Sequence, residues 1–584
     1  MNHSHGSECP CGACENSNSR RDFIKSVALL SGGLAIAGTA VAGAIEEVDH
    51  ASADNLFHKS TTVQQGKASH ITLLYTADIH GQILSHHEFF FEKGKPVYKI
   101  RGGMAVLKTM LQSLKSSNPD NTLIIDAGDC FQGSGVAALS KGEAIIPLMN
   151  NIGYDLVLPG NWEVVYGKEM MLKDLGAYTA AKICANMVHD TRDELNGQLI
   201  FQPYWIKLIG GIKIGFIGYN DPLTSKRQSP AYSYGIKFTW PETNVAGYIR
   251  LLRDQEKCAM VFLVTHMGLA QQVDLANQSY VDGADYILGA DTHERVRKPI
   301  VGKYAMVTEP GAFGSFVAKL DIVVEDGKVK DRQYALLDVD PQQYKPDPEM
   351  IDLVRQAREP YKEELDKVIG RTKMALVRYY VMENPMDNMI TDAIMWKLKP
   401  DIALSNGFRF CPPLVPDARK GYGEITNDFL WSMLPVNSEA RRATVTGQQI
   451  WNWMEKELNN VFAKNPRDRF GGWMVRFKGM EVNFTMKREA GKRLNSIKVK
   501  GTALSLTQSY TVVACERNGD PGDVLCRIEN VKDAHNEGIT LHTIVSEYLA
   551  EFSPVAPKIE GRLTATDLPH NLLSQLDGYE YEFN

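Results

Sequence analysis

Residue types that bind divalent metal ions occur at five places in the N-terminal half of the chain, and four of the five follow an apolar run of strand length. Side chains at the carboxyl ends of parallel strands converge on one crevice of an open α/β sheet. One such motif alone is usually a surface pair or a turn, but five in order favour a metal site. The candidate ligands are Asp78, His80, Asp129, Asn161, His266, Asp291 and His293.

This set of ligands is large enough for two divalent ions, with Asp129 as the bridging carboxylate. Two ions roughly 3.5–4 Å apart clamp the attacking and leaving oxygens of an in-line displacement. The carbonyl of Asn161 is a neutral, hard ligand that suits manganese or magnesium beside carboxylates. The predicted chemistry is therefore hydrolysis assisted by two divalent metal ions.

The elements that must position these residues alternate along the chain from about residue 69 to residue 345. Apolar runs at 213–219 and 260–265 predict buried strands, and one-sided apolar patterns at 102–114 and 144–151 predict helices. Strands that alternate with helices indicate α/β layers.

The order of these motifs resembles that of the calcineurin-like metallophosphoesterases, and the second half of the chain narrows the resemblance to the 5′-nucleotidase family. The similar segments are 386–393, 401–409, 425–428, 434–435 and 445–450. The resemblance implies an α/β fold, α+β overall, with a four-layer β-sandwich metallophosphoesterase domain and a 5′-nucleotidase C-terminal substrate-binding domain. The expected ranges are 69–345 for the first domain, 346–370 for a linker helix and 371–570 for the second domain.

The linker is expected to form one helix from residue 349 to residue 369, closed by Gly370. Pro360 lies inside this range and is expected to bend the helix or to split it in two, because proline removes a backbone hydrogen bond.

Two departures from the family pattern change the expected chemistry. The family has a catalytic His and Asp where this chain has Trp162 and Val165, and an indole can supply only packing and an N–H donor. The family also has a His ligand at the position of Asp291. As a ligand this carboxylate would favour manganese over zinc or copper, and the alternative is an aspartate that only caps a turn.

Three residues of the second domain are expected to bind the substrate, namely Asn406, Phe408 and Arg409. Arg409 is the candidate for an anionic group, because a guanidinium binds tetrahedral oxyanions through paired donors, although a structural ion pair is the alternative. The predicted catalytic residues are Asn161, Trp162 and Arg409. The loop at 518–523 lacks the aromatic residue with which nucleotidases clamp the base, which weakens the nucleotide interpretation.

The thiosulfohydrolase branch of the family, from the bacterial sulfur-oxidation system, is similar in its Trp-Glu pair, in a nearby Tyr-Gly and in segments 404–409 and 471–476. That resemblance implies two manganese ions and release of sulfate from a cysteine S-thiosulfonate on the arm of a carrier protein. Two alternatives stay open: a 5′-nucleotidase or phosphomonoesterase that hydrolyses a small anionic ester, and a non-catalytic protein that binds metal and ligand.

The first 42 residues resemble a twin-arginine export signal, with Arg20-Arg21 ahead of a short apolar stretch and an Ala-x-Ala cleavage site at 40–42. We therefore expect export through the twin-arginine translocase to the periplasm, cleavage, and no membrane span afterwards. The net charge of -6 over 584 residues gives no reason to expect a nucleic acid polymer as partner. Cys9, Cys11 and Cys14 would be lost with the leader, and the pairing of the other six cysteines cannot be read from their spacing.

Overall fold

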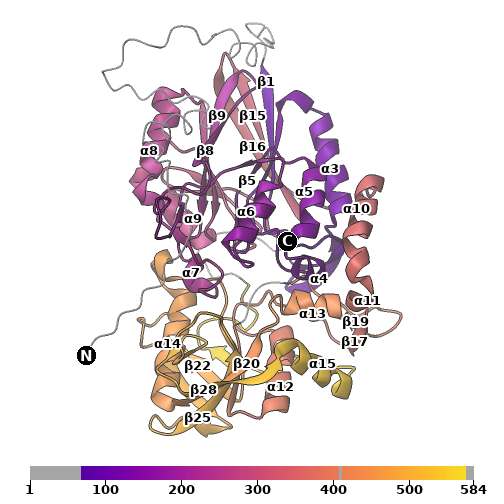
Figure 1. The fold of residues 1–584 in the computed structure, drawn as a ribbon, viewed down its shortest axis with the longest axis vertical. Helices are drawn as coiled ribbons and strands as arrows, with labels where there is room; N and C mark the ends of the chain where they lie inside the picture. The colour runs from indigo at the N-terminus through magenta and orange to yellow at the C-terminus, as the bar shows by residue number, and fades with distance from the viewer. Residues whose placement is uncertain (1–67, 407–410, 574–584) are drawn as a thin grey trace, which may run out of the picture. The chain divides into compact units, whose positions relative to one another are not determined.

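The computed structural model describes residues 68–406 and 411–573, and two six-stranded sheets form the frame of its first half (Figure 1). The first sheet has the spatial order β16 (Lys328–Asp338), β15 (Phe316–Glu325), β1 (Ser69–Thr76), β4 (Thr122–Asp126), β5 (Leu156–Val157) and β6 (Ala181–Lys182). The second has the order β13 (Ile300–Val301), β14 (Met306–Thr308), β12 (Tyr286–Leu288), β11 (Met260–His266), β9 (Ile212–Asn220) and β8 (Tyr204–Ile209).

The two sheets pack face to face with helices on their outer faces. In β11, Phe262 and Val264 belong to the core shared with the first sheet, whereas Val261 and Leu263 belong to a separate core on the opposite face. This alternation follows from the two-residue period of a strand. Helices α8 (Val245–Arg250) and α9 (Leu269–Ala276) contribute to that separate core. Helices α3 (Met104–Ser116) and α5 (Ile146–Ile152) share the core of the first sheet, and α10 (Pro348–Arg358) packs against these two helices. The predicted four-layer α/β sandwich is confirmed.

The parallel parts of the two sheets determine where the site lies. Strands β1, β4 and β5 are parallel neighbours in one sheet, and β9, β11 and β12 are parallel neighbours in the other. Their carboxyl ends therefore point to one end of the sandwich, where the loops that follow them meet.

The linker differs from the single helix that the sequence predicts. A 3-10 turn at η6 (Glu359–Tyr361) separates α10 from α11 (Lys362–Leu365), so the expected split at Pro360 is confirmed. The prediction of a helix up to residue 369 is wrong, because β17 (Val368–Thr372) pairs with β19 (Gly423–Thr426). The β-branched residues of β17 favour a strand, and Gly370 packs against Leu549, where an added Cβ would lie 2.9 Å from the leucine Cβ.

The second half contains a five-stranded sheet in the order β21 (Arg476–Lys478), β18 (Ile402–Ser405), β25 (Ser509–Cys515), β20 (Glu439–Thr446) and β28 (Lys532–Thr540). Helices α12 (Pro385–Leu398) and α15 (Leu541–Phe552) share one core with it. Helix α14 (Gly447–Phe462) shares another core with a four-stranded sheet, β24 (Thr502–Ala503), β23 (Leu494–Val499), β22 (Met480–Phe484) and β29 (Leu563–Ala565). The domain limits given above stay predictions.

The predicted leader, residues 1–42, lies outside the described residues. Within the described ranges no helix has the length and apolar character that a membrane crossing requires. The six cysteines of these ranges are free thiols.

Candidate metal centre

The seven predicted ligands lie in the loops at the carboxyl ends of the parallel strands, and all of them are buried. Asp78 and His80 follow β1, Asp129 follows β4, and Asn161 follows β5. His266 is the last residue of β11. Asp291 and His293 follow β12, in the neighbouring position of the second sheet. The structure thus brings together residues that are up to 215 positions apart in the sequence.

Five of these residues have left-handed backbone conformations, which residues with a side chain rarely adopt. The φ angles are 53° for Asp78, 52° for His80, 63° for Asp129, 92° for Asp291 and 61° for His293. Each such residue costs about 1–3 kcal/mol, and such conformations persist where the surrounding structure fixes them, often at functional sites. The fold therefore gives up stability to direct these five side chains inward.

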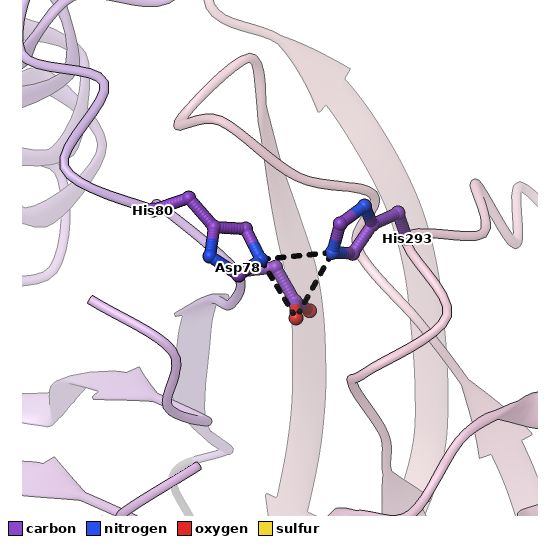
Figure 2. A group of neighbouring side chains, drawn as sticks. All are labelled: Asp78, His80 and His293. Atoms are coloured by element: carbon purple, nitrogen blue, oxygen red, sulfur yellow. Dashed lines mark hydrogen bonds and ion pairs between the residues drawn. The ribbon is translucent and has the colours of Figure 1, made fainter. Parts of the chain in front are cut away.

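Asp78, His80 and His293 form the first group of side chains that could hold a metal ion (Figure 2). The Nε2 atoms of His80 and His293 are 2.9 Å apart, and they lie 3.8 Å and 3.5 Å from Oδ1 of Asp78. This carboxylate oxygen is buried and has no hydrogen-bond partner among the described residues. A buried polar atom without a partner is costly, so the three side chains fit a divalent cation between them.

Asp78, Asp129 and His266 form the second group. Nε2 of His266 lies 3.0 Å from Oδ2 of Asp129 and 3.8 Å from Oδ1 of Asp78. Its Nδ1 lies 2.7 Å from the backbone oxygen of Ala127, which orients the ring. Oδ2 of Asp129 also lies 3.9 Å from Nε2 of His80. Asp78 belongs to both groups, and Asp129 lies near a histidine of each, His266 and His80. The bridging role expected of Asp129 stays a prediction.

Asn161 and Asp291 lie beside the second group. Nδ2 of Asn161 donates to Oδ1 of Asp291 over 2.6 Å, and its Oδ1 accepts from Nε2 of Gln228 over 3.0 Å. Oδ1 of Asp291 lies 3.9 Å from Nε2 of His266. Oδ2 of Asp291 accepts from Nη1 of Arg227 over 2.8 Å. The sequence interpretation did not foresee Arg227 or Gln228 at this place.

His80 and His266, one histidine from each group, differ in the direction of their pKa shifts. Burial lowers the pKa of His80 well below its usual value, and the neighbouring His293 lowers it further. Burial also acts to lower the pKa of His266, but Asp129 and Asp78 outweigh it and raise this pKa well above the usual value. Metal ligands must be deprotonated. An ion bound at the second group would therefore take the place of a proton shared by His266 and Asp129.

Glu163 organises the loop that carries Asp129, and the sequence interpretation assigned it no role. Its carboxylate accepts hydrogen bonds from the backbone N–H groups of Gly160 (2.6 Å), Asp129 (2.9 Å), Cys130 (2.6 Å) and Phe131 (3.3 Å). Burial and the charge of Asp129 raise the pKa of Glu163 to about 8. In the sequence, the position of Glu163 two residues after the candidate ligand Asn161 could have indicated this role.

Trp162 lies in the wall of the site. Its backbone N–H donates to Oδ1 of Asp129 over 2.7 Å. Its side chain is 7% exposed and packs with Val165, Tyr232 and Val436. The indole thus presents an apolar surface beside the metal groups, and the backbone N–H of Trp162 holds Asp129.

A cavity of about 70 Å³ opens on the metal groups. One side is formed by predicted ligands, and the opposite side by residues of the second half of the chain. The first set is Asp129, Asn161, Asp291 and His293, and the second includes Asn406, Glu457, Phe470, Trp473 and Arg527. Nε and Nη2 of Arg527 donate to the carboxylate of Glu457 over 2.8 Å and 2.5 Å. Two of the three predicted substrate-binding residues, Phe408 and Arg409, lie outside the described residues.

A second cavity of about 70 Å³ adjoins the first, and its wall is mostly apolar. Four residues line both cavities: Trp162, Arg227, Gln228 and Asn406. Leu404, Ile390 and Leu434 are among the apolar residues that line only the second. The arrangement provides a metal-binding end and an apolar end that share one wall.

Residues 368–516 match the sequence model of the 5′-nucleotidase C-terminal domain family. The chain is 25% identical over 507 residues to the trifunctional nucleotide phosphoesterase protein YfkN of Bacillus subtilis, which covers 78% of this chain but only 33% of that protein. It is 24% identical over 541 residues to the 5′-nucleotidase of Vibrio cholerae, covering 84% of this chain and 92% of that one.

The fold is also that of a solved sulfate thiohydrolase, SoxB of Thermus thermophilus. The two structures superpose with a TM-score of 0.77 at 20% identity, over 86% of this chain and 98% of that one. At this identity the likeness shows the shared fold alone.

Proposed function

We propose that this chain, a member of the 5′-nucleotidase family of metallophosphoesterases, is a hydrolase that uses two divalent metal ions to release sulfate from a cysteine S-thiosulfonate. The family follows from the matched C-terminal domain and from relatives aligned over most of the chain. The two metal groups, which share Asp78 and meet at one cavity, support the use of metal ions.

The observation that supports a sulfur substrate is that the described part of the metal cavity offers no spare proton donor. Its one imidazole, on His293, belongs to the first metal group, and the carboxylate of Glu457 is held by Arg527. Trp162, at the position of the family's catalytic histidine, cannot give up a proton at neutral pH. A persulfide leaves without much protonation, whereas the alkoxide of a nucleotide needs an acid. The site therefore suits the better leaving group.

The reaction balances as a simple hydrolysis. The oxygen of a water molecule forms a bond to the terminal sulfonate sulfur, and the bond between that sulfur and its neighbour breaks. The products are sulfate, the cysteine persulfide and one proton. When bound, the two metal ions acidify water and stabilise negative charge on the reacting group. The protein supplies the ligands, excludes bulk water through Trp162 and binds the rest of the substrate in the apolar cavity.

The test compares two substrates in parallel with the chain freed of residues 1–42 and supplied with Mn2+. Sulfate release is followed from a peptide that carries cysteine S-thiosulfonate, and phosphate release from AMP. Sulfate alone supports the proposal. Phosphate alone refutes it in favour of the alternative below, and silence on both with two metal ions bound would leave a binding role.

The alternative function is that of a 5′-nucleotidase or phosphomonoesterase. It is favoured by the match of residues 368–516 to the 5′-nucleotidase C-terminal domain and by the alignment with the nucleotidase of Vibrio cholerae. It requires slow turnover without the histidine and aspartate that Trp162 and Val165 replace.

Partner, metal and location complete the proposal. A carrier protein would present its cysteine-bearing arm to the apolar cavity. Mn2+ would be the preferred ion because four of the seven candidate ligands are hard carboxylate or amide oxygen donors. Export to the periplasm through the twin-arginine translocase would precede function. Arg20→Lys with Arg21→Lys is expected to retain the full-length chain in the cytoplasm, measured by cell fractionation. Unchanged export of that variant would contradict this route.

A further inference from the structure

Three buried charged residues form a chain of ion pairs beside the second metal group. Nη1 of Arg227 donates to Oδ2 of Asp221 over 2.7 Å and to Oδ2 of Asp291 over 2.8 Å. The side chains of Asp221, Arg227 and Asp291 are 0%, 11% and 3% exposed. A guanidinium is not deprotonated in proteins, so Arg227 carries a positive charge between two carboxylates.

The fold fixes this chain of ion pairs at both ends. Asp221 directly follows β9, and the end of β9 lies in register with the end of β11, where Asn220 is opposite His266. Arg227 is the last residue of α7 (Thr224–Arg227), whose start is tied back through a hydrogen bond from Leu223 N to Oδ1 of Asp221 over 2.9 Å. Strand β9, the parallel neighbour of β11, thus places Arg227 at the metal cavity.

The two oxygens of Asp291 have different surroundings. Oδ2 accepts a hydrogen bond from Arg227, whereas Oδ1 accepts one from Nδ2 of Asn161 over 2.6 Å and lies 3.9 Å from Nε2 of His266. A ligand carboxylate is commonly oriented in this way, by a hydrogen bond to the oxygen that does not bind the metal. Oδ1 is therefore the oxygen of Asp291 that faces the second metal group.

Charge gives the reason for the arginine. A neutral imidazole at this position would add no charge, whereas Asp291 adds one negative charge to a site that already contains Asp78 and Asp129. The guanidinium of Arg227 offsets that charge, and Asp221 holds the same Nη1 atom of Arg227 through a second ion pair. The Asp291–Arg227 pair is neutral, like the histidine that it would replace. With Asp221 included, the three residues carry a net charge of one negative unit.

We propose that Arg227 is a positioning residue, which with Asp221 holds Asp291 as a one-oxygen ligand of the second metal ion, so that the Asp291–Arg227 pair takes the place of a neutral histidine. The inference rests on the proposed two-metal site, but it does not depend on which substrate is hydrolysed.

The test measures the affinity for the second Mn2+ by titration followed with Mn2+ electron paramagnetic resonance, and the metal content by elemental analysis. The variant Asp221→Asn with Arg227→Met keeps the overall charge and removes the guanidinium. We expect it to bind the second ion 10- to 100-fold more weakly, the usual effect of losing an outer partner of a ligand, and to bind the first ion unchanged. Asp291→His alone, which places an imidazole beside an Arg227 that keeps only its ion pair with Asp221, is expected to lower the affinity for the second ion at least tenfold.

The decisive variant combines all three changes: Asp291→His, Asp221→Asn and Arg227→Met. We expect it to bind the second ion within about threefold of the wild type, because the pair and the histidine are equivalent ligands. Arg355→Gln, on the exposed face of α10 where Arg355 pairs with Asp352, is the matched control and should change nothing.

Two results would overturn the inference. One is a second-ion affinity of the Asp221→Asn, Arg227→Met variant equal to that of the wild type; the other is a triple variant no better than that double variant. Weaker binding of inorganic phosphate with unchanged metal affinity would also overturn it, since Arg227 would then contact the substrate instead. A wild-type chain that binds fewer than two ions would refute the two-metal proposal itself, which separates the two failures.

Discussion

The two walls of the metal cavity are built in different ways. The wall from the first half of the chain consists of strand-end loops, and three of the candidate ligands that line it, Asp129, Asp291 and His293, have left-handed conformations. The wall from the second half consists of side chains fixed by distant partners, such as Arg527, which pairs with Glu457 seventy positions away. Arg527 also has a left-handed conformation, with a φ of 67°, so the walls differ in degree: the first depends more on local backbone geometry and the second more on tertiary pairing. We expect the first to tolerate far less change.

The largest effect should come from Asp129→Ala, which removes the carboxylate that reaches both metal groups. We expect loss of the second metal ion and a fall in turnover of about 10³-fold or more, since stabilisation of charge by metal ions contributes several kcal/mol. Metal content and product release measure the two effects. Full activity in this variant would refute the two-metal interpretation, and Asp352→Ala on the exposed face of α10 is the control.

Glu163→Ala should have the next largest effect, because it leaves four backbone N–H groups of the Asp129 loop without their acceptor. Orphaned buried donors cost about 1–3 kcal/mol each before relaxation and water entry, so we expect a loss of about 3 kcal/mol in the free energy of unfolding. Urea denaturation of the metal-free protein measures it. Glu169→Ala, on the exposed side of α6 (Lys168–Gly176), should change it by less than about 0.5 kcal/mol.

A comparison of two glycines tests the tight geometry of the first wall. A Cβ added at Gly160 would lie 2.2 Å from Oδ1 of Asp129 and 2.5 Å from its backbone nitrogen, whereas one added at Gly176 meets nothing within 4 Å. Gly160→Ala should therefore cost about 2 kcal/mol of stability and displace Asp129, and Gly176→Ala should be neutral or slightly stabilising. Thermal unfolding and metal titration measure both. Equal behaviour of the two variants would mean that the Asp129 loop is adaptable.

The difference between the walls also explains how much could be predicted from the sequence. The four layers and the convergence of the seven candidate ligands could be predicted from the sequence, because Asp78, Asp129 and His266 follow or end apolar runs, which are local features. Their roles as ligands stay predictions. The partners Arg227 and Asp221 were missed, since nothing near Asp291 in the sequence indicates that an arginine 64 positions away contacts it. The predicted end of the linker helix was wrong for the opposite reason. An apolar pattern typical of a helix continues to Ile369, but residues 368–372 pair with β19 and form a strand.

The smallest predicted effect is a pH dependence of stability that arises in the second half of the chain, beside the apolar cavity. His542 lies on α15, and its Nε2 lies 2.8 Å from the backbone oxygen of Leu434, next to the loop residues Pro435 and Val436 that line the apolar cavity. Burial lowers the pKa of His542 to about 4. As the pH falls from about 6.5 toward 4, the unfolded chain takes up a proton at His542 that the folded chain does not. The contribution of His542 to the free energy of unfolding is therefore fully present above this pH window and is lost within it. We expect the wild type to lose about 1.8 kcal/mol of the free energy of unfolding from this residue between pH 7 and pH 5. His542→Gln, which can still donate to Leu434 but does not titrate, should lose correspondingly less, as measured by urea denaturation at both pH values. The same pH dependence in both proteins would show that His542 does not contribute to acid sensitivity.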